Sequence, residues 1–201
     1  MPPATSLEAA WTAVDYQGEG VVGFDLAGGE AGNPAAAHQA AFAHCEAHGL
    51  ACTCHAGEGA GAGSIAEAIH VCHATRIGHG TRLLEDPVLL REVRDRGIAI
   101  ECCLTSNVQT HTIPSIDAHP LRTLVEAGVA VSLNTDNRLM SGTDLVTEYS
   151  LAARHLGFSF EELAALARQG FVNAFLPEPE RTALLARVDA EIAALRQEVA
   201  R

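Results

Sequence analysis

Five short segments of strand length, most of them apolar, constrain the fold of this chain most strongly, and stretches with helical signals separate them. These segments are residues 21–26, 50–54, 76–80, 98–103 and 129–134. Short apolar strands that alternate with helices predict a parallel sheet with right-handed crossovers. We therefore expect an α/β fold whose chemistry lies at the carboxyl ends of the strands.

Capping signals predict where several helices begin. The spacing of a capping box occurs in residues 5–8, 64–67 and 159–162. An N-cap residue precedes a proline at Asn33 and at Asp86. The predicted helices cover residues 5–16, 33–48, 64–73, 86–97, 120–127 and 144–156, a segment starting at 159, and 180 to the end.

All five predicted strands are followed by polar or conformationally permissive residues. In chain order these are Gly28 and Gly29, His55 with Glu58, His79, Ser106 with Asn107, and Asp136 with Asn137. A neutral imidazole and a carboxylate at one strand end, as at His55 and Glu58, can hold a metal ion and move a proton beside it. One His-x-x-Glu pair is a weak signal. Five strand ends with polar groups at one edge of a sheet favour a catalytic site over packing alone.

The composition limits the classes of partner. With 201 residues, 48% of them apolar, the chain is expected to form one globular domain. A net charge of −12 argues against nucleic acid and against anionic membranes, because both need clustered Lys and Arg. No apolar run is long enough to span a membrane, and the first residues lack the features of a signal peptide. We therefore expect a cytoplasmic protein with reduced cysteines.

Two residue types narrow the chemistry. The sequence contains no lysine, and this excludes a Schiff-base lysine, a P-loop lysine and a carbamylated lysine that bridges two metal ions. Six cysteines are present, and Cys52, Cys54 and His55 have the order of a thiolate zinc knuckle. Alternation along a strand places Cys52 and Cys54 on one face. Packing as small buried hydrophobes is the favoured interpretation, and the knuckle is the alternative.

Motifs around the predicted strand ends resemble those of one enzyme family. They lie at residues 21–28, 53–58, 76–80, 105–110 and 132–136, with a further match at 174–177. The chain resembles the adenosine deaminases, in which these motifs occur in this order and at these spacings, over essentially its whole length. The resemblance implies a metal-dependent amidohydrolase with a TIM-type (β/α)8 barrel. It also implies hydrolysis of adenosine, or of 2′-deoxyadenosine, to inosine and ammonia.

The resemblance also implies roles for particular residues. His55 and Asp136 match ligands of a single Zn²⁺ ion, and Asp136 also contacts the metal-bound water. Glu58 matches the acid that protonates purine N1, and His79 matches the histidine that orients or deprotonates the water. Gly28 matches the glycine whose backbone N–H meets purine N3.

The chain departs from the family in two places. A second aspartate that binds purine N7 is replaced by Asn137, whose amide can donate to N7 as it stands. The His-x-His motif of the family's first strand is absent from the sequence. We therefore expect residues 1–201 to form a partial barrel domain that lacks the amino-terminal third. It would contain strands equivalent to the fourth to eighth, followed by carboxyl-terminal helices.

The missing motif affects both metal binding and partners. His55 and Asp136 alone are too few protein ligands for catalytic zinc. Five strands of a closed barrel also leave two open sheet edges. A separate amino-terminal polypeptide that completes the barrel is therefore an expected partner, besides the purine nucleoside.

Two other interpretations remain open from the sequence. In the first, the chain is an inactive remnant or a non-enzymatic binding protein on the same scaffold. In the second, it belongs to a deaminase of adenine or of an adenine nucleotide. A nucleotide requires groups that bind phosphate. Arg76, Arg82 and Arg138 are available for this role, but nothing in the sequence groups them.

Overall fold

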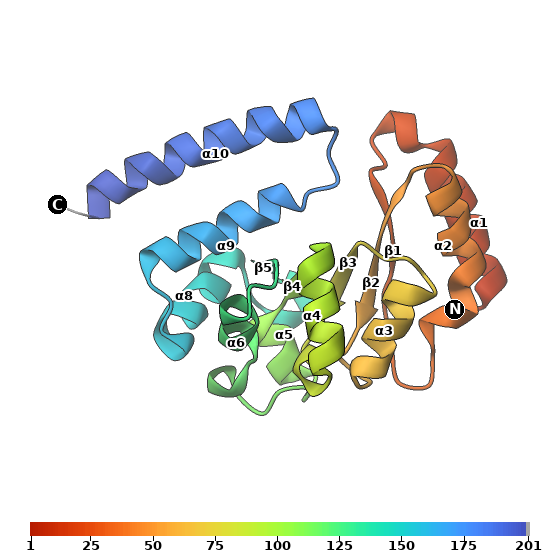
Figure 1. Ribbon diagram of the computed structural model, residues 1–201, viewed down its shortest axis with the longest axis horizontal. Coiled ribbons are helices and arrows are strands. Elements are labelled where there is room, and N and C mark those ends of the chain that lie inside the picture. The colour runs from red at the N-terminus through yellow and green to blue at the C-terminus, as the bar shows by residue number, and fades with distance from the viewer. Residues whose placement is uncertain (200–201) are drawn as a thin grey trace.

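A five-stranded parallel sheet forms the centre of the computed structural model, which describes residues 1–199 (Figure 1). Its strands are β1 (Gly23–Leu26), β2 (Ala51–Ala56), β3 (Arg76–His79), β4 (Ala99–Cys102) and β5 (Val131–Leu133). They lie in the order β1-β2-β3-β4-β5, and each pairs in parallel with the next. Because every crossover steps in the same direction, the sheet forms an arc of the kind found in β/α barrels. A doubly wound sheet would reverse its strand order. The predicted α/β class is confirmed.

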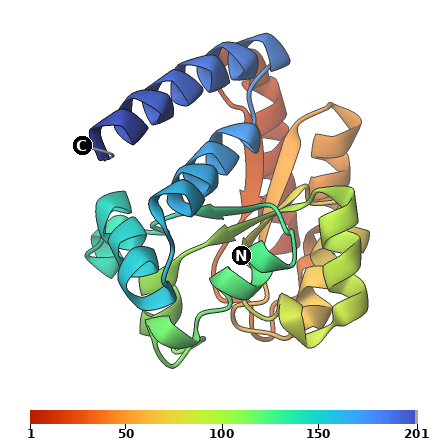
Figure 2. The same cartoon turned by 60° about the vertical axis from the view of Figure 1, so that its left-hand side comes forward.

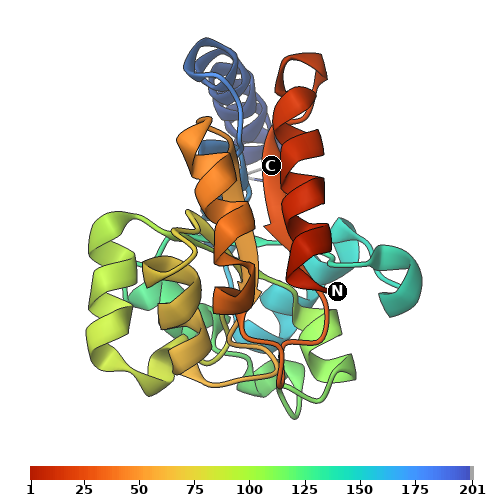
Figure 3. The same cartoon turned by 90° about the vertical axis from the view of Figure 1, so that its right-hand side faces the viewer.

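Helices follow the strands and extend beyond the last one. They are α1 (Pro3–Asp15), α2 (Gln39–Ala47), α3 (Ala62–His70), α4 (Pro87–Arg96), α5 (Leu104–Gln109), α6 (Leu121–Glu126), α7 (Arg138–Ser141), α8 (Leu145–Leu156), α9 (Phe160–Val172) and α10 (Glu178–Val199). Helices α1 and α2 lie side by side near β1 (Figure 3). At the other end of the sheet, α10 runs along α9, which packs on β5 (Figure 2). Within residues 1–199, none of the helices is both long and apolar enough to cross a membrane.

The capping predictions succeeded where the cap is purely local. Asp86 accepts hydrogen bonds from the N–H groups of Val88 and Leu89 at the start of α4. Residues 159–162 form the predicted capping box at the start of α9. The helix predicted from about residue 180 is α10, and its predicted last two residues, 200–201, lie outside the described part of the chain.

Three other predicted caps are wrong. Helix α1 begins at Pro3 and α3 begins at Ala62, before the predicted capping boxes. Ser64 instead accepts a hydrogen bond from the N–H of Gly57, 7 residues earlier. The Asn33 amide donates to the carbonyl of Gly29, and a short 3-10 helix (Ala35–His38) precedes α2. The side chains of Ser64 and Asn33 thus bond outside the helices they were expected to cap.

One face of the sheet carries the apolar core. Phe24, Ile77 and Ile100 are buried there, together with Cys52 and Cys54. All six cysteines are unpaired and buried. Burial raises the pKa of Cys52 to about 12, so this thiol is a poor source of the thiolate that zinc needs. The core interpretation of the cysteines holds, and the zinc knuckle has no support.

The alternate positions form a polar face. Pairing of the strands aligns Thr53 with Arg76, and Gly78 with Glu101. The Thr53 hydroxyl donates to Glu101 at 2.9 Å, and Arg76 Nε lies 3.1 Å from the same carboxylate. Beyond α9, the Phe175 ring lies 3.5 Å from the Arg76 guanidinium. Parallel sheets usually carry apolar residues on both faces, so this polar face is the place to look for a site.

Candidate active site

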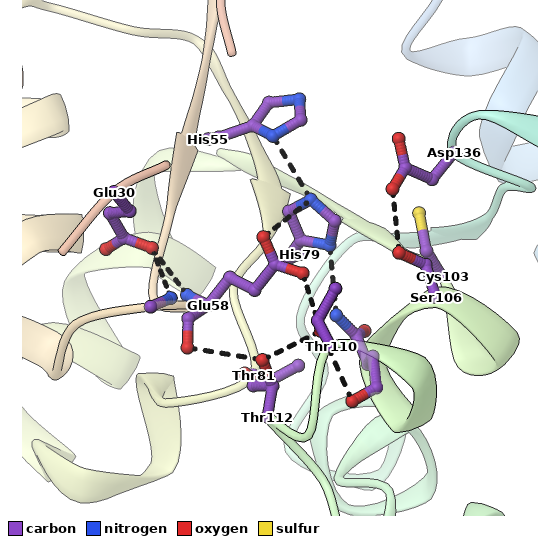
Figure 4. A network of polar contacts seen from close by, with 12 residues as sticks. Glu30, His55, Glu58, His79, Thr81, Cys103, Ser106, Thr110, Thr112 and Asp136 are labelled. Atoms are coloured by element: carbon purple, nitrogen blue, oxygen red, sulfur yellow. Dashed lines mark hydrogen bonds and ion pairs between the residues drawn. The ribbon is translucent and has the colours of Figure 1, made fainter. Parts of the chain in front are cut away.

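Three of the predicted site residues lie close together at the carboxyl ends of β2 and β3. The potential ligand atoms of His55, Glu58 and His79 all lie within 4.8 Å of one another. His79 Nε2 is 3.1 Å from His55 Nδ1 and 3.5 Å from Glu58 Oε2 (Figure 4). The register of the sheet explains this grouping, because β2 and β3 are adjacent and end at the same edge.

Local backbone geometry makes room for the imidazoles. A Cβ atom at Gly78 would lie 2.9 Å from Cδ2 of the His55 ring, so only glycine allows the ring its position. His79 and Asp136 have φ angles of 66° and 52°. Non-glycine residues rarely adopt this left-handed conformation, and such strain tends to occur at functional sites.

The loop that carries Glu58 is held by Glu30. The Glu30 carboxylate accepts hydrogen bonds from the N–H groups of Gly57, Glu58 and Gly59, at 2.9, 2.8 and 2.7 Å. At the other end of Glu58, the Thr110 hydroxyl donates to Oε1 at 3.0 Å. Figure 4 shows both sets of contacts. The Glu58 carboxyl group is therefore positioned from its backbone and from its tip.

The other predicted residues lie further from this group. Asp136 is exposed and accepts a hydrogen bond from the Ser106 hydroxyl at 2.7 Å (Figure 4). It lines one pocket together with His55 and His79. Asn137 is exposed and caps α7, with Oδ1 accepting from the N–H of Met140. The donor that purine N7 would need, Nδ2, is on the other side of that amide.

Gly28 lies in a second pocket, on the β1 side of His55. Its φ angle of 120° suits glycine, and no atom lies within 4 Å of where its Cβ would be. His55 lines both this pocket and the one that contains Asp136. The structure thus places His55 between the predicted purine contact and the predicted metal-binding aspartate.

Burial controls the charges in the site. It lowers the pKa of His79, against the opposing effect of the Glu58 carboxylate, and favours a neutral ring. Asp25 Oδ2 lies 3.7 Å from His55 Nε2. Burial raises the pKa of Asp25, and the nearby His55 partly opposes that shift.

Sequence reasoning missed four residues that shape the site. They are Asp25, Glu30, Thr110 and His119. Asp25 was detectable in principle, because it is a carboxylate in the middle of an apolar strand. The contacts of Glu30 and Thr110 with the loop at Glu58 span 27 to 52 residues of sequence, and no local pattern marks them.

The donor set suits a metal ion. Imidazole nitrogens and carboxylate oxygens are the usual ligands of catalytic zinc. Within residues 1–199, the close group consists of His55, Glu58 and His79, and Asp136 is not part of it. The group brings one predicted metal ligand, His55, next to the two residues predicted to act on protons, and the second predicted ligand, Asp136, lies outside it.

Imidazoles and carboxylates at the carboxyl ends of strands that form a barrel arc are typical of the class of β/α-barrel enzymes. The chain belongs to the adenosine deaminase family, whose model matches residues 1–191. Adenosine deaminase from Klebsiella pneumoniae (strain 342) is 45% identical over 170 residues, which are 85% of this chain and 51% of that protein. Adenosine deaminase from Mycobacterium tuberculosis (strain H37Rv) is 39% identical over 196 residues, covering 92% of this chain and 54% of that protein. The chain spans about half the length of the curated relatives it matches.

Solved structures with the same fold include several deaminases. An adenine deaminase from Arthrobacter aurescens superposes with a TM-score of 0.88 at 26% identity, over 96% of this chain and 59% of that one. Arabidopsis ADAL in complex with IMP gives a TM-score of 0.87 at 28% identity, over 96% and 56%. These neighbours are TIM-barrel deaminases, and the sheet of this chain corresponds to an incomplete barrel.

Proposed function

We propose that this chain forms the carboxyl-terminal part of a zinc-dependent enzyme that hydrolyses adenosine, or 2′-deoxyadenosine, to inosine and ammonia. The observation that carries the proposal is the convergence of His55, Glu58 and His79 in a member of the adenosine deaminase family. His55 and Asp136 would hold the ion. When bound, Zn²⁺ lowers the pKa of a coordinated water to about 7 and so supplies a nucleophile.

Glu58 is the proposed general acid. Attack at C6 of the purine pushes electrons toward N1, which then needs a proton. Hydrogen bonds from the Thr110 hydroxyl and from the Glu58 backbone to Glu30 hold the carboxyl group of Glu58 in one orientation. A well-placed general acid typically contributes about 10²- to 10⁴-fold in rate.

The remaining roles concern binding and orientation. His79, buried next to Glu58, acts on the attacking water. The backbone N–H of Gly28 is the proposed donor to purine N3, and the Nδ2 group of Asn137 is the proposed donor to N7. Ser106 orients the Asp136 carboxylate by donating to Oδ2.

Two further zinc ligands and three further strands are proposed to come from a segment outside these 201 residues. Among residues 1–199, β1 pairs only with β2, and β5 only with β4. A parallel β/α segment of three strands, the first of which ends in His-x-His, would join these two edges and close the barrel. The segment belongs either to the same polypeptide or to a separate amino-terminal one.

A nucleoside substrate is favoured over a nucleotide. Arg76 pairs with Glu101 on the sheet, and Arg82 pairs with Glu85. Of the three arginines considered for phosphate, Arg138 alone lies next to the predicted substrate residues. The relatives named for adenosine are also more similar in sequence than the structural neighbours named for adenine or for N6-methyl-AMP.

A hybrid enzyme tests the proposal. It joins this chain to the amino-terminal half of the Klebsiella pneumoniae relative, and it is assayed with adenosine, adenine and AMP in the presence of zinc. We expect turnover of adenosine, and a loss of about 10²-fold or more in Glu58→Gln. The control is Glu19→Gln, an exposed residue far from the site. Preference for adenine or AMP would refute the substrate, and a folded, zinc-loaded hybrid without turnover would favour an inactive remnant.

A further inference from the structure

A chain of hydrogen bonds behind His79 connects the site to the start of α6. The backbone N–H of Leu121 donates to Nδ1 of His119 at 3.1 Å. Nε2 of His119 lies 3.1 Å from Oδ1 of Asn107, and Nδ2 of Asn107 lies 3.0 Å from Nδ1 of His79. The exposed fractions of His119, Asn107 and His79 are 4%, 0% and 2%, so water does not compete for these bonds.

We call this chain of hydrogen bonds the relay. The direction of each of its bonds follows from its first donor, the backbone N–H of Leu121. A backbone N–H cannot accept a hydrogen bond, so His119 accepts at Nδ1. Burial lowers the pKa of His119 to about 4, and the neutral ring carries its proton on Nε2. His119 then donates to Oδ1 of Asn107, which leaves Nδ2 of Asn107 to donate to His79. The reverse direction would set two donors against each other at Leu121.

We propose that Asn107 and His119 are positioning residues that hold the proton of neutral His79 on Nε2. A histidine nitrogen that accepts a hydrogen bond leaves the proton to the other nitrogen. On the opposite side of the ring, Nε2 of His79 lies 3.1 Å from Nδ1 of His55 and 3.5 Å from Oε2 of Glu58, so a proton on Nε2 has acceptor atoms in reach. The relay therefore turns an N–H group, and not a lone pair, toward the site.

The position of the proton on His79 decides between the two roles considered for this residue, which are to orient the attacking water or to deprotonate it. This consequence for catalysis rests on the proposed deaminase function. With its proton on Nε2, neutral His79 orients a water molecule by donating to the water oxygen. It cannot take a proton from that water, because its lone pair is on Nδ1, which faces Asn107. His79 is then a hydrogen-bond donor in the reaction, and the general base is a different group.

Nitrogen NMR reads the tautomer directly. The sample is the metal-free chain, labelled with ¹⁵N-histidine and held at mildly alkaline pH. Protonated and unprotonated ring nitrogens have different ¹⁵N shifts, and the signals of His79 are those lost in His79→Gln. We expect a protonated Nε2 and an unprotonated Nδ1. The opposite pattern in the wild-type chain would overturn the proposal.

Asn107→Asp tests the donor in the relay. The substitution keeps the shape of the side chain but replaces the Nδ2 donor by an acceptor, so we expect Nδ1 of His79 to gain a proton. Asn173→Asp is the matched control. Its Oδ1 accepts from Gln169 at 3.0 Å, a bond that a carboxylate keeps, and the His79 signals should not move. If Nδ1 of His79 stays unprotonated in folded Asn107→Asp, the proposal is wrong.

His119 is tested by a pair of variants. His119→Gln keeps a donor and an acceptor and should retain the Nε2 tautomer, whereas His119→Ala should give a mixture of tautomers. A single Nε2 tautomer in folded His119→Ala would remove His119 from the relay. Because the readout needs neither substrate nor metal, failure of the hybrid to deaminate adenosine would refute the proposed function and leave this result standing.

Discussion

Replacing Glu30 by glutamine should loosen the loop that carries Glu58. One carboxylate oxygen accepts from the N–H of Gly57, and the other accepts from the N–H groups of Glu58 and Gly59. In Glu30→Gln, the most favourable orientation of the new amide directs its carbonyl oxygen at the N–H groups of Glu58 and Gly59. Gly57 then faces an amide N–H₂, but its N–H still donates to Ser64 at 2.9 Å.

The expected cost follows from this geometry. Two bonds change from a charged to a neutral acceptor, which lowers the contribution of each by about 1 kcal/mol. We therefore expect Glu30→Gln to lower the free energy of unfolding by about 2 kcal/mol. Glu67→Gln is the comparison variant, in which only one such bond changes. The Glu67 carboxylate accepts from a single backbone N–H, that of Ala36, at 2.8 Å. This variant should cost about half as much.

The assay is equilibrium unfolding in urea, combined with hydrogen exchange of the amides at residues 57–59. If only local opening is affected, these amides should exchange about 30-fold faster in Glu30→Gln, corresponding to about 2 kcal/mol. Unchanged exchange at all three amides, with a stability within about 0.5 kcal/mol of wild type, would refute the claim that the Glu30 carboxylate holds this loop in place.

Three further perturbations test other parts of the structure. Burial lowers the pKa of His119 from 6.5 to about 4, so between those pH values the unfolded chain binds a proton that the folded chain does not. Stability should fall as the pH drops through this window, by about 3 kcal/mol in total, and urea titrations should show a smaller fall in His119→Gln. Gly78→Ala places a Cβ 2.9 Å from the His55 ring and should weaken zinc binding to the hybrid by about 10- to 100-fold, measured by competition with a chelator. Gly63→Ala, with no atom within 4 Å of the new Cβ, should leave zinc affinity unchanged. Asp86→Ala removes the cap of α4 and should cost about 1 kcal/mol in a thermal melt, and an unchanged melt would show that the cap does not contribute.

The strands were predictable from sequence because their signals are local. Residues 76–80 were expected to form a strand, and β3 covers Arg76–His79. The segment expected at residues 98–103 became β4, Ala99–Cys102. Ile77, Ile98 and Ile100 mark these two segments, and Gly80 and Gly97 limit them.

The helix starts were less predictable because several polar side chains have distant partners. Glu67 was expected to complete a capping box with Ser64, but its carboxylate binds the backbone at Ala36. The same reason hid much of the site. Adjacent strand ends bring His55 and His79 together, which the order of the strands implies. Glu30 and His119 act through contacts that only the folded chain creates.

The central claim is that this site needs metal ligands from beyond the 201 residues. The most direct test measures the zinc content of the purified chain and of the hybrid enzyme, and their conversion of adenosine to inosine, under the same conditions. The account predicts that the hybrid binds one zinc ion and produces inosine, whereas the chain alone does neither. Stoichiometric zinc and inosine formation by the chain alone would contradict it.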